Sequence, residues 1–396
     1  MNSQRVILTY RHFLVFILVS YAVVFSPFVD AGLRNYLVLL AGAVGGVLFL
    51  SLRLPMNRQS LWALLLFYIM TLQSLYLDGP RLLGSVGLTF LYAMGYFATA
   101  SLLNRIADKR SFLMKVMRGI IFAFAILSVI QMLASLAGLP MPNEMATKGM
   151  WSYNSLAFEP SQLGRVVGIS MLCYLVLSNL PGESEPPRER LKLVIAFVIT
   201  MLLSGSALAA AAILLVYVLS RSLPWVILAV TVSSLIWPVF LGIDYEPIQR
   251  FILLASNIGS LDLDQVLAAE HSGGIRVAPF LIYLRDASVE EVGYWLGYGA
   301  EGLTYFFQGK IPGMRDDVVG AGFLPGFAVV YGGLVFAFFV WVFVLRQANQ
   351  ITLPLIAFWA IFMTSSGWNT QVFWYGLIVI QVAWAVSRDR FNCPQV

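Results

Sequence analysis

The chain has 396 residues, of which 59% are hydrophobic and 11% charged, and its formal net charge is +5. A typical soluble domain has about 25% charged residues, so this composition excludes an ordinary soluble enzyme of the same length. No block of basic residues interleaved with aromatics is present, which argues against nucleic-acid binding. Two cysteines, Cys173 and Cys393, are too few for a disulfide framework.

Uninterrupted apolar runs of about 20 residues recur along the chain, and each can cross a hydrocarbon core of about 30 Å as a helix. Such runs are too long for barrel strands, and only helices or closed barrels satisfy the backbone inside a bilayer. The first run has no small-x-small cleavage site, so we interpret it as a retained span. We predict an all-α polytopic membrane protein with about twelve spans. The spans are expected near residues 13–29, 35–52, 60–77, 82–103, 119–137, 163–180, 191–203, 206–220, 223–242, 320–345, 352–366 and 371–387.

The stretch 191–220 is divided into two spans because Ser204-Gly205-Ser206 interrupts it. With a cytoplasmic N-terminus, 16 of the 25 basic residues then fall in cytoplasmic segments and 9 outside. This is the positive-inside pattern, and it also places the C-terminus in the cytoplasm. A single span over 191–220 would invert every later loop, which the same rule disfavours.

Residues 1–396 are interpreted as a single integral membrane domain with two large segments outside the cytoplasm. One is the loop 138–162, and the other is the long loop 243–319 between the ninth and tenth spans. An apolar run at 277–284 is too short to span, so we expect a helix lying in the interface or over the bundle. No internal repeat is visible, which weighs against transporters built from inverted halves.

Two candidate functional residues lie at the start of the sixth span. Arg165 lies a little over one turn inside it, where a charge is unfavourable unless it faces the bundle, a cavity or the headgroups. It is interpreted either as an arginine that snorkels to the outer interface or as an anion ligand. Glu159, before Pro160, either favours helix initiation or is a carboxylate that accepts a proton at the mouth of the bundle.

The long outer loop supplies the other candidates. Arg276 follows Gly273-Gly274 and could pair bidentately with a phosphate, although a loop arginine is also commonly a solvated charge. Arg285 and Arg315 are weaker examples of the same pattern. A glycine-rich stretch, 295–302, is a further candidate to cradle a ligand. Its residues Tyr298 and Glu301, and Asp317 beyond it, complete the set of candidates.

The chain offers little evidence for a metal site. Asp262-Leu263-Asp264 has the Asp-x-Asp form that holds a metal with a nucleotide-sugar, but we place it outside the cytoplasm, where nucleotide-sugars are not expected. The two histidines of the chain, His12 and His271, are far apart, and neither an HExxH pattern nor a His/Cys cluster exists. No P-loop is present either. We therefore expect neither a bound metal nor another cofactor.

Four short motifs occur in order between about residues 151 and 345. Phe158-Glu159-Pro160-Ser161 opens a span, and Leu202-Leu203-Ser204-Gly205-Ser206 precedes a helix of small residues. Gly273-Gly274-Ile275-Arg276 is followed about twenty residues later by Leu296-Gly297-Tyr298-Gly299. Phe323-Leu324 then leads to Tyr331-Gly332-Gly333. This series resembles that of bacterial O-antigen and exopolysaccharide polymerases of the Wzy type, which are relatives of the O-antigen ligases.

Two departures from the family pattern matter. Gly205 stands where the family often has an arginine, so one anion ligand is missing or is supplied elsewhere. The ligases have a functional histidine just before the F-L of the last motif, whereas residues 318–322 here contain none. The second departure favours polymerase over ligase.

The resemblance implies a GT-C-like glycosyltransferase that acts without a metal. Its donor and acceptor would be undecaprenyl-pyrophosphate-linked glycans, polymerised at the periplasmic face of the bacterial inner membrane. Membrane lipids, a chain-length regulator and a flippase are the further candidate partners. The pyrophosphate ligands would be Arg276 first, then Arg165, with Arg285 and Arg315 behind them. The acceptor hydroxyl would be deprotonated by Glu159, with Glu301 and Asp317 as alternatives and Tyr298 as a substrate contact in the loop.

Other functions stay open at this point. One is an O-antigen ligase, which moves glycan onto lipid A-core. The ligases share the motifs, but they have a histidine that this chain lacks. A flippase or other transporter of lipid-linked oligosaccharides predicts charges drawn from many spans, whereas here the outer charges concentrate in two loops. Peptidoglycan polymerases of the shape-and-division type share the size and plan but no local motif.

Overall fold

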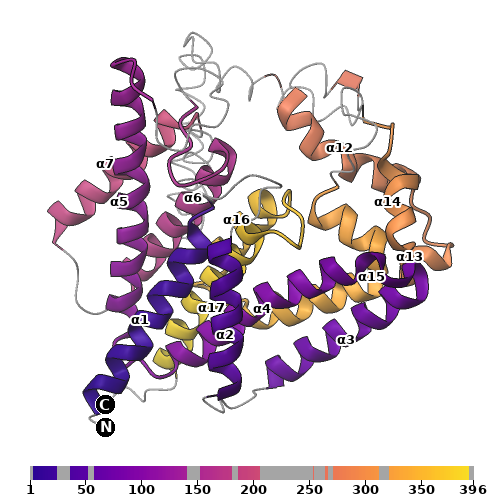
Figure 1. Cartoon of the computed structure of the whole chain (residues 1–396), viewed down its shortest axis with the longest axis horizontal. Coiled ribbons are helices and arrows are strands. Elements are labelled where there is room, and N and C mark those ends of the chain that lie inside the picture. The colour runs from indigo at the N-terminus through magenta and orange to yellow at the C-terminus, as the bar shows by residue number, and fades with distance from the viewer. Residues whose placement is uncertain are drawn as a thin grey trace.

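The computed structural model describes residues 3–24, 36–51, 58–140, 152–180, 186–205, 253, 264–265, 271–311 and 321–391 (Figure 1). Within these ranges every regular element is a helix, which confirms the predicted all-α class. Helical stretches long and apolar enough to cross a membrane are Ser60–Leu103, Lys109–Leu136, Pro160–Ser178 and Phe323–Gln347. Together with the composition, they indicate a membrane-embedded protein. The number of twelve spans stays a prediction, because the expected spans 206–220 and 223–242 lie outside the described residues.

The first five helices follow the predicted spans closely at most of their ends. They are α1 (Ser3–Ala22), α2 (Tyr36–Ser51), α3 (Arg58–Asp78), α4 (Leu83–Leu103) and α5 (Lys109–Leu136), with the short 3-10 helix η1 (Gly79–Leu82) between α3 and α4. The first and fifth helices begin about ten residues before the predicted spans. The reason is that apolarity marks where a helix enters the bilayer, whereas capping marks where it begins. In α5 the Asp108 side chain accepts a hydrogen bond from the Ser111 amide at 3.2 Å, so the basic segment after it is already helical.

Helices α6 (Pro160–Ser178) and α7 (Pro187–Leu203) both pack against α5. Each begins with a proline, whose missing amide hydrogen is not needed in the first turn. The seventh helix ends where the sequence predicted a break. Gly205 there has a φ of +64°, the left-handed conformation that commonly follows a helix end.

Three helices of the segment 271–307 lie together at one end of the molecule (Figure 1). They are α12 (His271–Asp286), α13 (Val292–Leu296) and α14 (Gly299–Phe307). The predicted short helix at 277–284 is therefore the central part of α12. Helices α12 and α14 share a small separate core with α15, which is composed of Ala278, Ile282, Phe306, Phe307, Ile311 and Val329. This core holds the loop helices over the end of the α3–α4 pair.

The C-terminal helices form the centre of the described bundle. They are α15 (Phe323–Phe343), α16 (Leu353–Phe358) and α17 (Gln371–Phe391), with the 3-10 helix η2 (Leu345–Gln347) and the π-helical segment η3 (Trp359–Met363) between them. Helix α17 packs against α1, α4 and α6. Its first residue, Gln371, donates hydrogen bonds of 2.5 to 3.2 Å to the carbonyls of Ser20, Tyr21 and Val23, and so satisfies the end of α1.

Helix α15 is kinked, and the kink holds the LGYG loop (residues 296–299). Gly332 leaves helical geometry with φ +79° and ψ +165°, and the Tyr298 amide donates to the Val329 carbonyl at 2.8 Å. Gln73 of α3 donates to the carbonyls of both Leu296 and Tyr331. Two of the motifs noted in the sequence, LGYG and YGG, therefore contact each other through backbone atoms.

We predict that Gly332→Ala destabilises the protein. A Cβ at this position would lie 2.3 Å from the Trp295 carbonyl oxygen and 2.4 Å from the Gly297 nitrogen, and the φ is unfavourable for alanine. Backbone strain of this kind costs about 1–3 kcal/mol, and each kcal/mol shifts the melting temperature of a domain of 150–250 residues by about 2–4 °C. Thermal unfolding in detergent is expected to show a melting temperature lower by about 2–12 °C. Gly119→Ala, in a helix where a Cβ meets nothing within 4 Å, is the control and should not lower it.

Candidate functional site

The start of α6 places the Glu159 carboxylate at the mouth of the bundle. Glu159 has an extended backbone (φ −131°, ψ +151°) and precedes Pro160, so the local structure is the helix start that the sequence suggested. Its side chain is exposed and does not cap the helix. The carboxylate accepts a hydrogen bond from the Ser161 hydroxyl at 3.1 Å. Helix initiation and an accessible carboxylate are thus both present at this residue.

A buried polar network fixes the segment before Glu159. Gln131 of α5 accepts a hydrogen bond from the Ser155 amide at 2.7 Å and donates to the Asn154 side chain at 3.1 Å. Asn154 in turn donates to the Phe158 carbonyl at 3.2 Å. Ser155, with a positive φ of 50°, donates its hydroxyl to the Phe124 carbonyl at 2.8 Å. The position of Glu159 is therefore set from α5 through hydrogen bonds that are buried or, at Phe158, partly buried.

Arg165 is half-buried in α6, and its neighbours come from distant parts of the chain. It donates a hydrogen bond to the hydroxyl of Ser366, in the segment 364–370, called here the Ser366 loop. It lies close enough to Arg276 for the two like charges to interact, and close enough to Glu159 for opposite charges to attract. The structure therefore brings together Glu159, Arg165 and Arg276, three of the residues selected from the sequence.

Arg276 and Arg285 lie on opposite faces of the same helix. Both are in α12, but nine residues apart, which corresponds to opposite faces and about 13 Å along a helix. Arg276 is exposed beside the buried Gly274, on the side that meets Arg165. Only the first of the two arginines is therefore positioned to act with Arg165 on one ligand.

Arg285 is bound by a carboxylate of its own. Its guanidinium donates to both oxygens of Asp286, at 2.6 and 3.2 Å, and Lys310 donates to the same carboxylate at 3.0 Å. The hydrogen bonds from Arg285 and Lys310 lower the pKa of Asp286 to about 2, against the effect of partial burial. Asp286 is therefore ionised at neutral pH, and Arg285 is already neutralised there.

Tyr298, in the LGYG loop, and Glu301 have partners other than Glu159, Arg165 and Arg276. The Tyr298 hydroxyl donates to Glu291 at 2.6 Å, and burial together with that bond raises the pKa of the phenol above its usual value. Glu301 pairs with Arg81, at the end of the α3–α4 pair, at 3.6 Å, with side chains that are 85% and 72% exposed. Arg315 and Asp317 lie outside the described residues.

Several functional neighbours were not selected from the sequence. Ser366 lies in the run Thr364-Ser365-Ser366-Gly367-Trp368-Asn369-Thr370, and the hydroxyl-rich interruption between two apolar runs was the available signal. Gln131 and Asp78 each interrupt or end an apolar helix, and such polar residues in spans commonly have a partner. Their partners are far away in sequence, so their roles were not visible.

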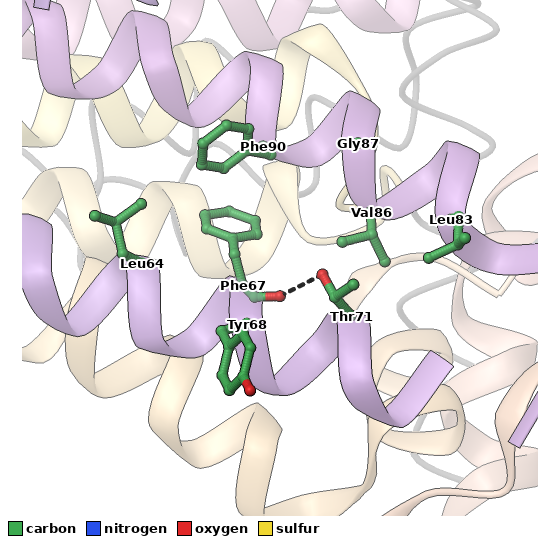
Figure 2. Close-up of a pocket in the computed structure, with 8 residues that line it drawn as sticks. All are labelled: Leu64, Phe67, Tyr68, Thr71, Leu83, Val86, Gly87 and Phe90. Atoms are coloured by element: carbon green, nitrogen blue, oxygen red, sulfur yellow. Dashed lines mark hydrogen bonds between the residues drawn. The ribbon is translucent and has the colours of Figure 1, made fainter. Parts of the chain in front are cut away.

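An apolar groove opens between α3 and α4 (Figure 2). It encloses about 710 Å³, including its open side. Thr71 is polar, but its hydroxyl donates to the Phe67 carbonyl of its own helix at 2.7 Å. The groove therefore suits a hydrocarbon chain rather than a polar ligand. Its lining consists of Leu64, Phe67, Tyr68, Thr71, Leu83, Val86, Gly87 and Phe90.

Comparison with known proteins finds no family model, no curated protein and no solved structure that matches this chain. The chemical interpretation of the site therefore rests on its geometry. That geometry is a pair of guanidinium groups from α6 and α12, with a carboxylate at the start of α6 and a hydroxyl from the Ser366 loop.

We predict that Gln131→Leu releases the segment that carries Glu159. The Ser155 amide loses its Gln131 acceptor and Asn154 loses a donor, and each buried hydrogen bond lost this way costs about 1–3 kcal/mol. Thermal unfolding should show a lower melting temperature, and limited proteolysis should cut within residues 152–158 sooner. Met132→Leu, in the next position of the same helix, is the volume-conserving control. Equal cleavage rates in the two variants would show that the network does not hold this segment.

Proposed function

We propose that this chain is a metal-independent glycosyltransferase that polymerises polyprenyl-pyrophosphate-linked oligosaccharide repeat units into a surface polysaccharide. The observation that carries the proposal is the proximity of Arg165 and Arg276, on separate elements, with Glu159 beside them. In this proposal the reaction takes place at the periplasmic face of the bacterial inner membrane. A chain-length regulator and a flippase are its candidate protein partners.

The paired arginines favour a ligand with more than one negative charge. The two guanidinium charges are near enough to repel each other, so an anion between them is favoured. One carboxylate offsets part of this, whereas a pyrophosphate offsets more and can be held bidentately by each arginine. The Ser366 hydroxyl fixes the Arg165 guanidinium, so its orientation is set before a ligand arrives.

The chemistry that such a site supports is displacement of a pyrophosphate from an anomeric carbon. A hydroxyl oxygen of the acceptor glycan forms a bond to that carbon, while the bond from the carbon to the pyrophosphate oxygen breaks. The leaving pyrophosphate keeps the electron pair, and Arg165 and Arg276 stabilise its developing charge. The proton of the acceptor hydroxyl passes to the Glu159 carboxylate, which is accessible at the mouth of the bundle.

The first test uses purified protein and an extracted polyprenyl-pyrophosphate-linked repeat unit, without added metal. Wild-type protein should give a ladder of products on a gel. Arg276→Ala and Arg165→Ala should each reduce the rate by about 100-fold or more, since each removes a group that stabilises the leaving charge. Arg285→Ala is the matched control on the same helix as Arg276. It should retain a rate within about twofold of wild type, because it removes only an exposed ion pair.

The other outcomes have definite meanings. Transfer that appears only when lipid A-core is added would identify a ligase. Absence of transfer to either acceptor, with binding of the lipid-linked glycan retained, would favour a transporter. Equal losses in Arg276→Ala and Arg285→Ala would remove the proposed role of the arginine pair.

A second test separates the candidate bases. Glu159→Gln should lower the turnover rate by about 100- to 10,000-fold with little change in substrate affinity, because general-base catalysis contributes on this scale. Glu301→Gln should remain close to wild type, since Glu301 pairs with Arg81 at the surface. The measurement is the initial rate of ladder formation as a function of substrate concentration. A larger loss in Glu301→Gln than in Glu159→Gln would contradict this assignment.

A further inference from the structure

A second group of polar side chains is buried between α3, α15 and the Ser366 loop. We call it the Tyr331 cluster, and it consists of Ser74, Asp78, Tyr331 and Trp368. Three of these residues are almost inaccessible, with exposures of 1% for Ser74, 0% for Tyr331 and 8% for Trp368. Ser74 and Trp368 lie close enough to Tyr331 to interact with its hydroxyl, and the charge of Asp78 also acts on it. The Tyr331 and Trp368 rings meet edge to face, with centroids 5.9 Å apart.

The polar atoms of the cluster lack hydrogen-bond partners in the part of the chain that the structure describes. They are the hydroxyls of Ser74 and Tyr331, the indole nitrogen of Trp368 and one carboxylate oxygen of Asp78. A buried polar group without a partner is unfavourable, and four in one place call for a shared explanation. Ser74, Trp368 and Asp78 all lie near the Tyr331 hydroxyl, so one group bound beside that hydroxyl can contact several of them.

The structural role of Asp78 accounts for only half of its carboxylate. Its Oδ1 atom accepts a hydrogen bond from the Ala300 amide at 2.7 Å, in the first turn of α14. Gly299 lies so close that an added Cβ would be 2.6 Å from the same oxygen. The Oδ2 atom is buried and has no partner among the described residues. The carboxylate is thus held by one oxygen, while the other is available as an acceptor.

The hydrogen-bond donors and acceptors of the cluster determine which kind of ligand it can bind. The two hydroxyls and the indole N–H can donate, while Asp78 Oδ2 can only accept when ionised. An anion would be repelled by the carboxylate, and a metal cation has no lone pair to accept the hydrogen bond that the Trp368 N–H can donate. A neutral O–H group fits, because it donates to one partner and accepts from the others.

We propose that the Tyr331 cluster is a binding site for an O–H group, which donates to Asp78 Oδ2 and accepts from Tyr331, Ser74 or Trp368. The group comes either from water or from a hydroxyl of a glycan. The glycan source rests on the proposed function, whereas the water source does not. The Ser366 loop connects the two sites, since Ser366 contacts Arg165 and Trp368 contacts Tyr331.

Hydroxyl-radical labelling by X-ray radiolysis tests the site directly, because it oxidises aromatic side chains beside bound water even when they are buried. The protein has a matched pair of controls in Trp374 and Tyr375, which are both 0% exposed. Their polar atoms already have protein partners, since Trp374 donates to the Trp368 carbonyl at 2.8 Å and Tyr375 bonds to Ser170 at 2.7 Å. Tyr331 and Trp368 should be oxidised several-fold faster than these controls in protein without glycan.

The second arm adds the polyprenyl-pyrophosphate-linked repeat unit. Protection of Tyr331 and Trp368 would identify a glycan hydroxyl that replaces the water, and unchanged labelling would leave water as the only source. The ladder assay reads the proposed function separately. Fast labelling without a ladder would retain the site and reject the polymerase.

A stability measurement covers the case in which the labelling is slow. Tyr331→Phe and Ser74→Ala should lower the melting temperature if the hydroxyls have a bound partner. Ser128→Ala is the control, because its hydroxyl is also fully buried and without a described partner, but it lies in α5. Two results together would overturn the proposal. Tyr331 and Trp368 would be labelled as slowly as Trp374, and Tyr331→Phe and Ser74→Ala would be no less stable than Ser128→Ala.

Discussion

The Ser366 loop leaves the helical hydrogen-bond ladder inside a bundle of apolar helices, and much of the site depends on how its polar atoms are satisfied. Irregular backbone at membrane depth is tolerated where protein covers it or where it lines a cavity. The Thr364 carbonyl accepts from the Phe323 amide at 2.8 Å, and the Trp368 carbonyl accepts from Trp374 at 2.8 Å. The Ser366 hydroxyl accepts from Arg165. Satisfying this loop thereby fixes the start of α15, the first turn of α17 and the arginine of α6. The π-helical segment η3 before it is the kind of irregularity that is frequent at functional sites.

The close backbone contact between the LGYG loop and α15 explains why glycines occupy both sides. Gly297 and Gly332 have positive φ, and side chains there would collide with carbonyls of the opposite segment. Gln73 then joins the two segments by donating to a carbonyl of each. The contact matters for the site because the loop helices α12, α13 and α14 are held over the bundle partly through it. Arg276 is carried by the first of these helices.

The same residue type has different consequences according to its surroundings. Arg285 has a carboxylate next to it and a second cation, Lys310, on that carboxylate, so its charge is balanced within the loop. Arg165 lies near another arginine, Arg276, as well as near Glu159. The charge of Arg165 is therefore balanced less completely by its neighbours than the charge of Arg285. Catalytic sites keep such unbalanced groups because they are complementary to a charged ligand or transition state. This contrast distinguishes Arg165 from Arg285.

The sequence by itself determined that the chain is helical and membrane-embedded, and it located most helix ends. Length and continuity of apolar runs carry that information locally, so α2, α3 and α4 lie where they were expected. Local punctuation also sufficed at Gly205, which ends α7. The early starts of α1 and α5 were missed because polar residues can continue a helix beyond the bilayer.

Only the tertiary structure decided which candidates act together. Glu159, Arg165 and Arg276 were each chosen from local sequence, but their proximity depends on how α6, α12 and the Ser366 loop pack. The same packing paired Glu301 with Arg81 and revealed Ser366, Gln131 and Asp78. The physical reason is range. Apolar periodicity and capping act over a few residues, whereas the hydrogen bonds and charges of the site join residues more than 100 positions apart, and only folding brings them within reach.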